Sequence, residues 1–248
     1  MKQRLDQALV AHGLVATRSQ AESYIRLGKV TVDGRVQTKP GYFVSSDSRV
    51  KLVAAERYVS RAGLKLASVA NKFSVQFQGS TVLDVGSSTG GFTDYALQHG
   101  ATKVFAVDVG TDQLHPSLRS DKRIELHEKT DIRDFTPSQM PDIVVMDVSF
   151  ISLREILPHI ATIVGKDTQI VAMVKPQFEA GKDQVNKGVI KNDRVRRDIL
   201  AGFEAWAKRY FVIDGKADSD VAGAKGNRER FYLLTLNRNS TTSPGCIT

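Results

Sequence analysis

Charged side chains stand beside apolar segments at points where buried strands are expected to end. Asp147 and Lys175 each come directly after an apolar run, and Glu229 stands at the start of the last expected strand. Ligands of open α/β sheets bind at the carboxyl ends of the strands. If the last strand is antiparallel, its start lies at that same edge, so these three side chains are expected to converge. A further lysine, Lys65, lies upstream in the stretch SRAGLKL.

An amine buried beside carboxylates is suited to general-base chemistry. A lysine in water has a pKa of roughly 10.4, but burial and a second nearby cation favour the neutral amine. Such an amine can remove the proton of a weakly acidic alcohol while the alcohol oxygen attacks a methyl group in line. Each of these residues alone is also compatible with a surface ion pair, whereas the set at converging strand ends favours a catalytic site.

The most informative motif is a glycine-rich turn between an expected strand at 81–85 and an expected helix at 93–98. Glycines let the backbone approach a ligand closely, and a helix N-terminus presents free N–H groups. A phosphate-binding loop would need lysine where Phe92 stands, and a dinucleotide fingerprint would need glycine in place of Ser88. The third ligand class with this geometry is S-adenosylmethionine, which carries no phosphate. The candidate cofactor-binding residues of the turn are Asp84, Gly86, Ser87, Gly90, Gly91 and Phe92.

Two further acids follow at the tips of neighbouring strands. Asp108 ends the next expected strand, where a carboxylate can hold the two ribose hydroxyls of an adenosine. Asp131, after the third expected strand, is a candidate for contact with the adenine or else a plain turn residue. In a sheet without a cofactor, Asp84 and Asp108 would instead cap loops. The glycine turn and the spaced acid together favour a nucleoside cofactor.

The elements that must position these groups alternate between strand and helix from about residue 80 onward. Five β-branched apolar segments are expected strands, at residues 81–85, 103–107, 124–127, 143–146 and 169–174. Helices are expected between them, for instance at 93–98 and 153–163, and are followed by a polar helix at 193–208 and strands at 211–214 and 230–236. This order is typical of an α/β fold with a mostly parallel sheet covered on both faces.

The N-terminal part of the chain has a different pattern. One helix is expected from residue 5 until Gly13, and a second, opened by the capping-box spacing of residues 17–20, until Gly28. Residues 30–36 place β-branched side chains on both sides of an Asp-Gly pair, which predicts a hairpin. A further strand is expected at 49–53.

The formal net charge of +8 is concentrated in this N-terminal part. Residues 1–58 hold ten of the 35 basic and five of the 27 acidic side chains, and the pattern weakens at 54–57, interpreted as a linker. A basic excess in a small unit favours a nucleic-acid partner over a merely solvated surface. The candidate RNA-binding residues are Arg4, Arg18, Arg26, Lys29, Arg35 and Arg61. A second basic patch, which fits an RNA channel or a solvated helix face, comprises Lys182, Lys187, Lys191, Arg194, Arg196 and Arg197.

Composition excludes several classes of protein. With 248 residues and 41% hydrophobic residues the chain can bury a core, and with Cys246 as its one cysteine it forms no internal disulfide and no thiolate zinc cluster. No metal is expected. No run approaches the roughly 18 apolar residues of a membrane span, and the N-terminus lacks a secretory signal, so a cytoplasmic protein is expected. A Ser/Thr/Asn-rich tail ends the chain, and residues 239–248 are expected to be disordered.

Seven segments together resemble one known family: SRAGLKL, LDVGSSTGGFTD, AVDVG, MDVSFISL, VKPQFE, GVIKN and GNRERF. The sequence resembles the TlyA ribosomal RNA 2′-O-methyltransferases, which also carry the name haemolysin A, over nearly its whole length. The resemblance implies a small α+β RNA-binding domain at 1–58, with the linker at its end. It also implies an FtsJ-like domain at 59–238, with the Rossmann-like class I methyltransferase fold and an antiparallel last strand.

The same resemblance implies an activity, namely methyl transfer from S-adenosylmethionine to the 2′-oxygen of a cytidine ribose in ribosomal RNA, with ribosomal subunits as partners. A Lys-Asp-Lys-Glu tetrad would correspond to Lys65, Asp147, Lys175 and Glu229. Lys175 would be the base, Lys65 and Glu229 would orient it, and Asp147 would face both the cofactor and the lysines. Asp131 departs from the family pattern, in which asparagine is expected.

Three other functions compete with this interpretation. A non-catalytic RNA-binding assembly factor could retain a vestigial cofactor site, although all four tetrad candidates are present. A base methyltransferase of the same fold is a closer rival. A haemolysin is suggested only by the family name, since the sequence offers no physical means of attacking a membrane. The sequence identifies neither the nucleotide nor the oligomeric state.

Overall fold

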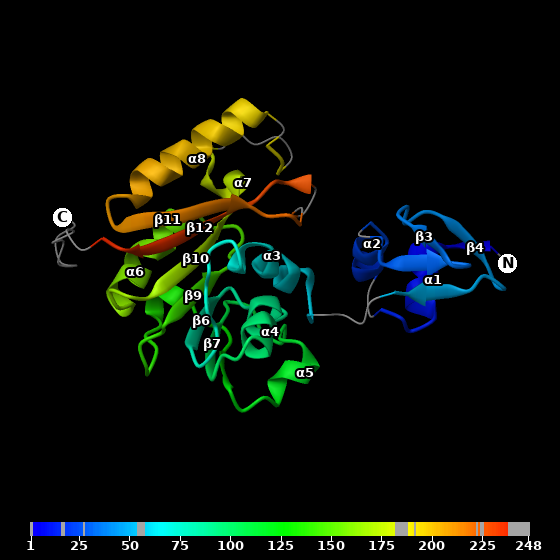
Figure 1. Ribbon diagram of the computed structural model, residues 1–248, viewed down its shortest axis with the longest axis horizontal. Helices are drawn as coiled ribbons and strands as arrows, with labels where there is room; N and C mark the ends of the chain where they lie inside the picture. The colour runs from blue at the N-terminus through cyan, green and yellow to red at the C-terminus, as the bar shows by residue number, and fades with distance from the viewer. Residues whose placement is uncertain are drawn as a thin grey trace. The chain divides into compact units, whose positions relative to one another are not determined.

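A computed structural model of the chain describes residues 2–15, 18–26, 28–53, 58–181, 188–190, 192–221, 223 and 226–237. The chain divides into two units, Met1–Arg57 and Tyr58–Thr248, each with its own hydrophobic core (Figure 1). The predicted linker at 54–57, the predicted tail at 239–248 and most of the predicted capping box fall outside the described residues or their described side chains.

The N-terminal unit packs two helices, α1 (Leu5–Ala11) and α2 (Arg18–Arg26), against short strands. Leu5, Leu9 and Ile25 are fully buried between them, as the helical spacing of these residues predicts. The strands are β1 (Lys2–Arg4), β2 (Val30–Val32), β3 (Arg35–Gln37), β4 (Phe43–Ser45) and β5 (Val50–Leu52), in a β3-β2-β5 sheet and a β1-β4 pair.

The predicted hairpin of this unit is confirmed. Val32 pairs with Arg35, so the loop holds only Asp33 and Gly34, both with positive φ (52° and 80°). Two left-handed residues give the turn a twist that matches the twist of the flanking strands. Gly13, with φ 65°, directly follows the C-cap of α1, and it confirms the predicted helix stop.

The C-terminal unit contains a seven-stranded sheet in the order β11-β12-β10-β9-β6-β7-β8. The five strands from β6 to β10 run parallel, whereas β12 runs antiparallel to both of its neighbours. This confirms the predicted mostly parallel sheet with an antiparallel last strand. The bounds are β6 (Thr81–Val85), β7 (Lys103–Val107), β8 (Ile124–His127), β9 (Ile143–Met146), β10 (Gln169–Val174), β11 (Phe211–Asp218) and β12 (Arg230–Leu236).

Helices cover both faces of this sheet (Figure 1). Along β10, Ile170, Ala172 and Val174 face one core, whereas Val171 and Met173 face the other. The first core contains α6 (Leu153–Ile163) and α8 (Asp193–Ala207); the second contains α3 (Arg61–Ala70), α4 (Gly91–Gln98) and α5 (Pro116–Arg119). A strand buried on both faces needs a continuous apolar run rather than an alternating one, which is why these strands stand out in the sequence.

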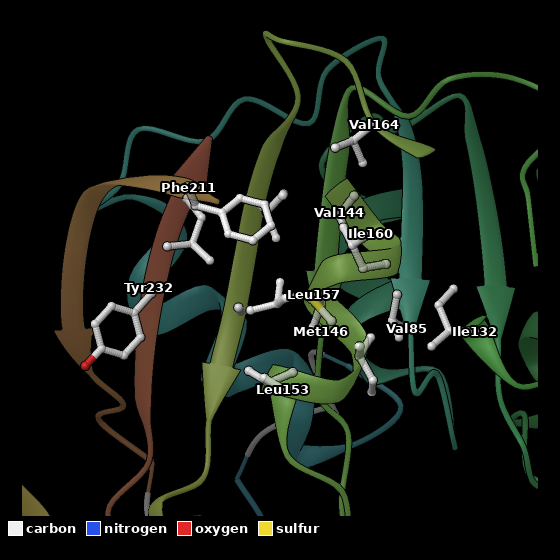
Figure 2. Close-up of a cluster of buried hydrophobic side chains, with 14 of the residues drawn as sticks. Val85, Ile132, Val144, Met146, Leu153, Leu157, Ile160, Val164, Phe211 and Tyr232 are labelled. Carbon is white, nitrogen blue, oxygen red and sulfur yellow. The ribbon is translucent and has the colours of Figure 1, made fainter. Parts of the chain in front are cut away.

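Figure 2 shows the first core, with Leu153, Leu157 and Ile160 of α6 turned toward the sheet. Leu157 and Ile160 are fully buried, and each such side chain stabilises the fold by about 1.5–3 kcal/mol relative to an exposed one. Because α6 begins directly after the segment that follows β9, this packing fixes where that segment ends.

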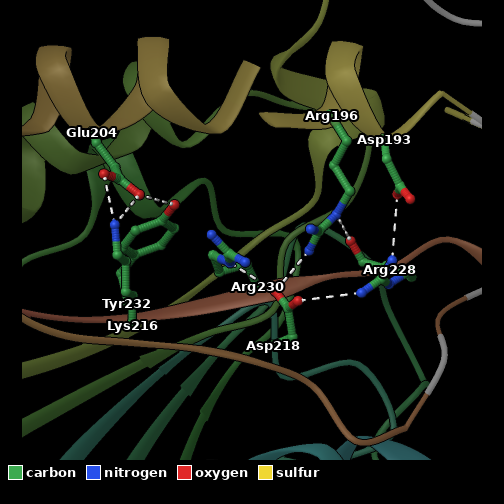
Figure 3. Close-up of polar contacts among 8 residues, drawn as sticks. All are labelled: Asp193, Arg196, Glu204, Lys216, Asp218, Arg228, Arg230 and Tyr232. Atoms are coloured by element: carbon green, nitrogen blue, oxygen red, sulfur yellow. Dashed lines mark hydrogen bonds and ion pairs between the residues drawn. The ribbon is translucent and has the colours of Figure 1, made fainter. Parts of the chain in front are cut away.

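The β11–β12 hairpin extends further than the sequence predicts. Instead of ending at 214, β11 continues to Asp218, and a register shift between Ile213 and Gly215 places one extra residue in the strand. The shift brings Asp218 opposite Arg230 of β12. Asp218 accepts hydrogen bonds from Arg230 and from Arg196 of α8, both at 2.7 Å, so one acid joins the helix to the hairpin (Figure 3).

The order of the strands reverses at β6, which has β7 on one side and β9 on the other. Open sheets of this type form a ligand crevice at the carboxyl ends of the strands beside such a reversal. The glycine turn follows β6, and Asp147 follows β9, with its backbone amide hydrogen bonded to Val85 O at 3.1 Å. The fold therefore brings the two most informative motifs of the sequence to one edge.

Candidate active site

The glycine turn is closely packed on both of its sides. Gly86 has φ 80°, and a Cβ atom there would lie 3.0 Å from the backbone oxygen of Asp147, so a side chain would strain the turn. At Gly91 a Cβ would lie 2.8 Å from Ala62 Cβ and 2.9 Å from Gly63 N. Gly91 is therefore required by the contact between α3 and α4, and Gly86 by the contact between the ends of β6 and β9.

Two buried polar atoms of this turn have no hydrogen-bond partner among the described residues. Asp84 is fully buried, and its Oδ2 accepts from Thr93 Oγ1 at 2.6 Å, while its Oδ1 makes no bond. Burial raises the pKa of Asp84 to about 7; the bond from Thr93 opposes this rise, and the nearby Asp147 adds to it. Ser87 Oγ is the second such atom. Both residues line one small cavity, so both atoms can meet a ligand there.

Asp108 is held rigidly at the tip of β7. Its Oδ2 accepts from the Ser88 amide at 2.8 Å, and its Oδ1 accepts from the Gly110 amide at 2.7 Å. Each carboxylate oxygen keeps further lone pairs, so the group can also accept from a pair of hydroxyls. Asp108 lines the larger of two cavities at this edge.

Asp131 lies at another wall of that larger cavity and is the N-cap of a short 3-10 helix, η1 (Ile132–Asp134). It accepts from the Arg133 amide and forms a two-point ion pair with the Arg133 guanidinium, at 3.0 and 2.6 Å. These bonds hold the pKa of the Asp131 carboxyl at about 2. The acid that departs from the family pattern is therefore neutralised by its neighbour.

The two cavities adjoin at the glycine turn. The larger measures about 380 Å³ and the smaller about 160 Å³. Gly86, Ser88, Asp147 and Ser149 line both. The larger one contains Asp108 and Asp131, whereas the smaller one reaches Asp84, Phe92 and Lys175. A ligand that occupies both would place one end near the acids and the other near the lysine.

The four tetrad candidates form two ion pairs. Lys175 Nζ lies 2.6 Å from Asp147 Oδ1, and Lys65 Nζ, on α3, lies 2.5 Å from Glu229 Oε2. All four side chains are 17% exposed or less. Val174 pairs with Arg230 across β10 and β12, so Lys175 and Glu229, the next residues outward, end adjacent strands side by side. The antiparallel direction of β12, expected from the sequence, is what brings Glu229 to this edge.

The chain was compared with known proteins. The sequence model of the FtsJ-like methyltransferases matches residues 58–237, and that of the S4 domain matches residues 3–50. The chain belongs to the FtsJ-like methyltransferase family. The glycine turn and the two ion-paired lysines all lie within the residues that this family model matches.

Relatives of this family match nearly the whole chain. The 16S/23S rRNA (cytidine-2′-O)-methyltransferase TlyA of Mycobacterium tuberculosis is 40% identical, over 97% of this chain and 92% of that protein. Hemolysin A of Brachyspira hyodysenteriae is 37% identical, over 91% of this chain and 97% of that protein. A solved structure from Streptococcus thermophilus, of a protein named as a hemolysin, has a TM-score of 0.74 at 38% identity, over 97% and 92% of the two chains.

Sequence reasoning missed two residues of this candidate site. Ser149 Oγ accepts from Lys175 Nζ at 2.6 Å, and Phe150 is 91% exposed while lining the larger cavity. Phe150 has φ 68°, an uncommon conformation for a bulky residue, and its ring lies 5.2 Å from the ring of Phe178. Both residues lie in an irregular segment, where no hydrophobic period marks a side chain. The signal available was an aromatic residue three positions after a strand-end acid.

The candidate RNA-binding residues differ in their surroundings. Arg26, Lys29 and Arg35 are exposed, whereas Arg4 and Arg18 both pair with the buried Asp6 at 2.9 Å. Arg61 is half-buried at the start of α3. In the second basic patch, Arg194 and Arg197 are exposed, but Arg196 is buried against Asp218. Lys182, Lys187 and Lys191 lie outside the described residues.

Within the part of the chain that the structure describes, no helix is both long and apolar enough to cross a membrane. The same residues contain no group of three metal-ligating side chains. The site is therefore described by its carboxylates, lysines and glycine turn alone.

Proposed function

We propose that this methyltransferase uses S-adenosylmethionine to methylate the 2′-hydroxyl of a cytidine ribose in ribosomal RNA. The observation that carries the proposal is the buried Lys175–Asp147 pair, which lies in the wall of a cavity that continues to the glycine turn. The names of relatives such as TlyA support cytidine in ribosomal RNA as the target. Such a substrate agrees with the cytoplasmic location expected from the sequence.

The residues around the two cavities fit S-adenosylmethionine. Asp84 Oδ1 and Ser87 Oγ are buried acceptors without partners, suited to the amino group of its methionine part. Asp108, at a strand tip, is suited to the ribose hydroxyls, and Asp131 lies where the adenine would end. Gly86 leaves room for the cofactor to lie against the backbone, because a side chain there would already contact Asp147.

The chemistry follows from the surroundings of Lys175. When bound, S-adenosylmethionine supplies a methyl group on a positively charged sulfur. The Lys175 ammonium donates a hydrogen bond to Ser149 Oγ and forms an ion pair with Asp147, and these two contacts hold it at the wall of the smaller cavity. Lys175 would take the proton of the ribose 2′-hydroxyl as the oxygen bonds to the methyl carbon, while the bond from that carbon to sulfur breaks and leaves a neutral thioether. Lys65 is paired with Glu229, which begins the strand beside the one that Lys175 ends, so this pair is assigned to orienting the base.

Phe150 offers a surface for the target base. An aromatic ring that is 91% exposed beside a cavity is suited to stacking with an unpaired nucleotide, a contact worth about 1–3 kcal/mol. Phe150→Ala is therefore expected to weaken the use of RNA about tenfold in kcat/KM without changing cofactor affinity. If kcat/KM for RNA and the affinity for S-adenosylmethionine fell by the same factor, Phe150 would belong to the cofactor site instead.

RNA affinity is assigned to the N-terminal unit, whose sequence matches the S4 domain. Its exposed Arg26, Lys29 and Arg35 are the side chains best placed to contact phosphates. Arg4 and Arg18 can do so only while they also neutralise Asp6.

The test is methylation of isolated ribosomal subunits with radiolabelled S-adenosylmethionine, followed by mapping of the modified nucleotide by alkaline hydrolysis. A 2′-O-methyl group blocks cleavage at its phosphodiester, whereas a methylated base does not. Lys175→Ala is expected to reduce turnover by about 100-fold or more with cofactor binding retained. Lys216→Ala, which removes a lysine paired with Glu204 away from the cavities, is the matched control. RNA binding without any methylated product would instead support a non-catalytic assembly factor.

A further inference from the structure

Two segments at the carboxyl edge of the sheet carry the groups proposed to act on RNA. We name residues 147–152, which follow β9, the acid loop, and residues 175–179, which follow β10, the lysine turn. Near the cavities the two segments meet through Lys175, which contacts Asp147 and Ser149, and through the rings of Phe150 and Phe178, which contact each other at an angle of 47°. The relative position of the two segments therefore decides where the amine lies.

One buried carboxylate, Glu179, joins the far ends of these segments. Its Oε2 accepts from Ser152 Oγ at 2.6 Å, and its Oε1 accepts from the Leu153 amide at 2.8 Å. The Glu179 side chain is 1% exposed, so water does not compete for these bonds. The Leu153 amide is one of the free donors in the first turn of α6, which has no partner within its own helix. Glu179 thus ties the lysine turn to the point where the acid loop becomes a helix.

The lysine turn is short and stiff enough to transmit a shift. Lys175 and Glu179 lie at the two ends of α7 (Pro176–Glu179), a single helical turn. The Phe178 amide donates to Lys175 O at 2.8 Å, the Ala180 amide donates to Pro176 O at 3.0 Å, and the proline ring fixes its own φ. A displacement of Glu179 therefore moves Lys175 as well.

We infer that Glu179 is a positioning residue for methyl transfer, because it holds the lysine turn against the acid loop and so orients the Lys175 amine between Asp147 and Ser149. The inference rests on the proposed function, in which Lys175 takes the proton. A misplacement of about 1 Å at a reacting group lowers the rate by about 100-fold. Nothing in the contacts of Glu179 reaches either cavity, so its loss should leave cofactor binding intact.

The experiment compares three variants of the full chain. Glu179→Ala removes the link. Glu179→Gln keeps it, because the amide oxygen can accept from Leu153 while the amide nitrogen donates to the Ser152 hydroxyl oxygen. Glu204→Ala is the control: Glu204 also joins two elements, through Lys216 at 3.1 Å and the Tyr232 hydroxyl at 2.9 Å, but away from the cavities (Figure 3). Each variant is measured for kcat and KM on ribosomal subunits, for S-adenosylmethionine affinity by calorimetry, and for melting temperature.

We expect Glu179→Ala to lower kcat by about 10- to 100-fold with cofactor affinity changed less than about twofold. We expect Glu179→Gln to restore kcat to within about threefold, and Glu204→Ala to lower only the melting temperature. A folded Glu179→Ala variant with kcat near that of the wild type would overturn the inference. So would a Glu179→Gln variant no better than the alanine variant, because the loss would then not depend on the hydrogen bonds.

A second measurement separates this inference from the proposed function. Hydrogen exchange of the backbone amides needs no activity: Glu179→Ala should exchange faster in both the acid loop and the lysine turn, and Glu204→Ala should not. If the wild type transfers no methyl group to RNA, the proposed function fails, and the exchange result alone decides whether Glu179 joins the two segments. Unchanged exchange in both segments would refute the link even in an active enzyme.

Discussion

Asp6 in the N-terminal unit and Asp84 in the C-terminal unit are both fully buried carboxylates, yet their surroundings are opposite. Asp6 accepts from the guanidinium groups of Arg4 and Arg18, each at 2.9 Å, and hydrogen bonding to Arg4 above all holds its pKa at about 2. Asp84 has only the Thr93 hydroxyl, and burial raises its pKa to about 7. Both side chains are shielded from water, yet burial dominates the pKa of Asp84 and hydrogen bonding dominates the pKa of Asp6, so the two pKa values move in opposite directions.

The difference separates a structural acid from an acid that is ready for a ligand. Both oxygens of Asp6 accept hydrogen bonds from within the protein, so the group stabilises the fold and needs no ligand. Asp84 keeps an oxygen unbonded in a cavity wall, where a cationic ligand group would both bond it and favour its ionised form. The exposure of the two side chains does not distinguish these roles, whereas their hydrogen-bond partners do.

Asp84→Asn should give the largest effect. The amide cannot pair with a cationic amino group, so we expect S-adenosylmethionine affinity to fall by about 10- to 100-fold, measured by calorimetry at pH 8. The folded protein without cofactor should lose no stability at that pH, because asparagine avoids the cost of ionising a buried acid. Unchanged affinity in a folded variant would show that Asp84 does not contact the cofactor.

Asp6→Asn should act on the other unit and on stability alone. Loss of two charge-assisted hydrogen-bonded pairs is expected to lower the free energy of unfolding of the N-terminal unit by about 1–3 kcal/mol. Hydrogen exchange within residues 2–15 and 28–53 reports this unit separately. The control is Asp47→Asn, at an exposed acid of the same unit. A loss of cofactor affinity in Asp6→Asn would contradict the purely structural role assigned to Asp6.

The stability of the two units against unfolding should also change with pH in opposite directions. The folded-state pKa of Asp6 lies below its usual value of 3.8, so its contribution is present above about pH 4 and is lost as the pH falls toward 2. The folded-state pKa of Asp84 lies above that value, so the stability of the C-terminal unit without cofactor falls as the pH rises from about 4 to 7. Exchange measured unit by unit across pH 3–8 tests both slopes, and slopes of equal sign would contradict the assignment.

Thr93→Val should give the smallest effect. It removes the hydroxyl that bonds Asp84, so the pKa of Asp84 should rise further and the pH at which cofactor affinity increases should move upward. We expect about a threefold loss of affinity at pH 7 and little loss at pH 9. A loss that is equal at both pH values would mean that Thr93 acts by packing instead.

The sequence predicts the parts of this molecule that have a strong local signal. The buried strands are β-branched runs, and the hairpin at Asp33 and Gly34 follows from the turn type that these residues favour. The strand-end positions of Asp147 and Lys175 follow from the same reasoning, since a parallel sheet collects its strand ends at one edge. Glu229 joins them only because β12 runs antiparallel, so that its start lies at that edge. Their predicted catalytic roles stay predictions until turnover of the variants is measured.

Other features depend on contacts distant in sequence, and no local pattern reveals them. The helix α3 contains Gly63, which lowers helix propensity; it is glycine because Tyr58 and the Gly91 backbone leave no room for a Cβ. β1 and β4 are three residues long, too short to show a period. The charge of Arg196 suggests a solvent-facing side chain, and only Asp218 of a different element explains its burial.

The extra residue in β11 has a consequence for the evolution of this edge of the sheet. The deletion of Gly215 would let the two strands pair without the shift and would keep Asp218 opposite Arg230, so Arg196 and Arg230 would retain their shared counter-ion. The deletion of Ala217, beyond the shift, would instead move Asp218 opposite Phe231 and turn its carboxylate to the other face of the sheet. A gap at the shift should therefore be commoner among relatives than a gap two residues further along the strand.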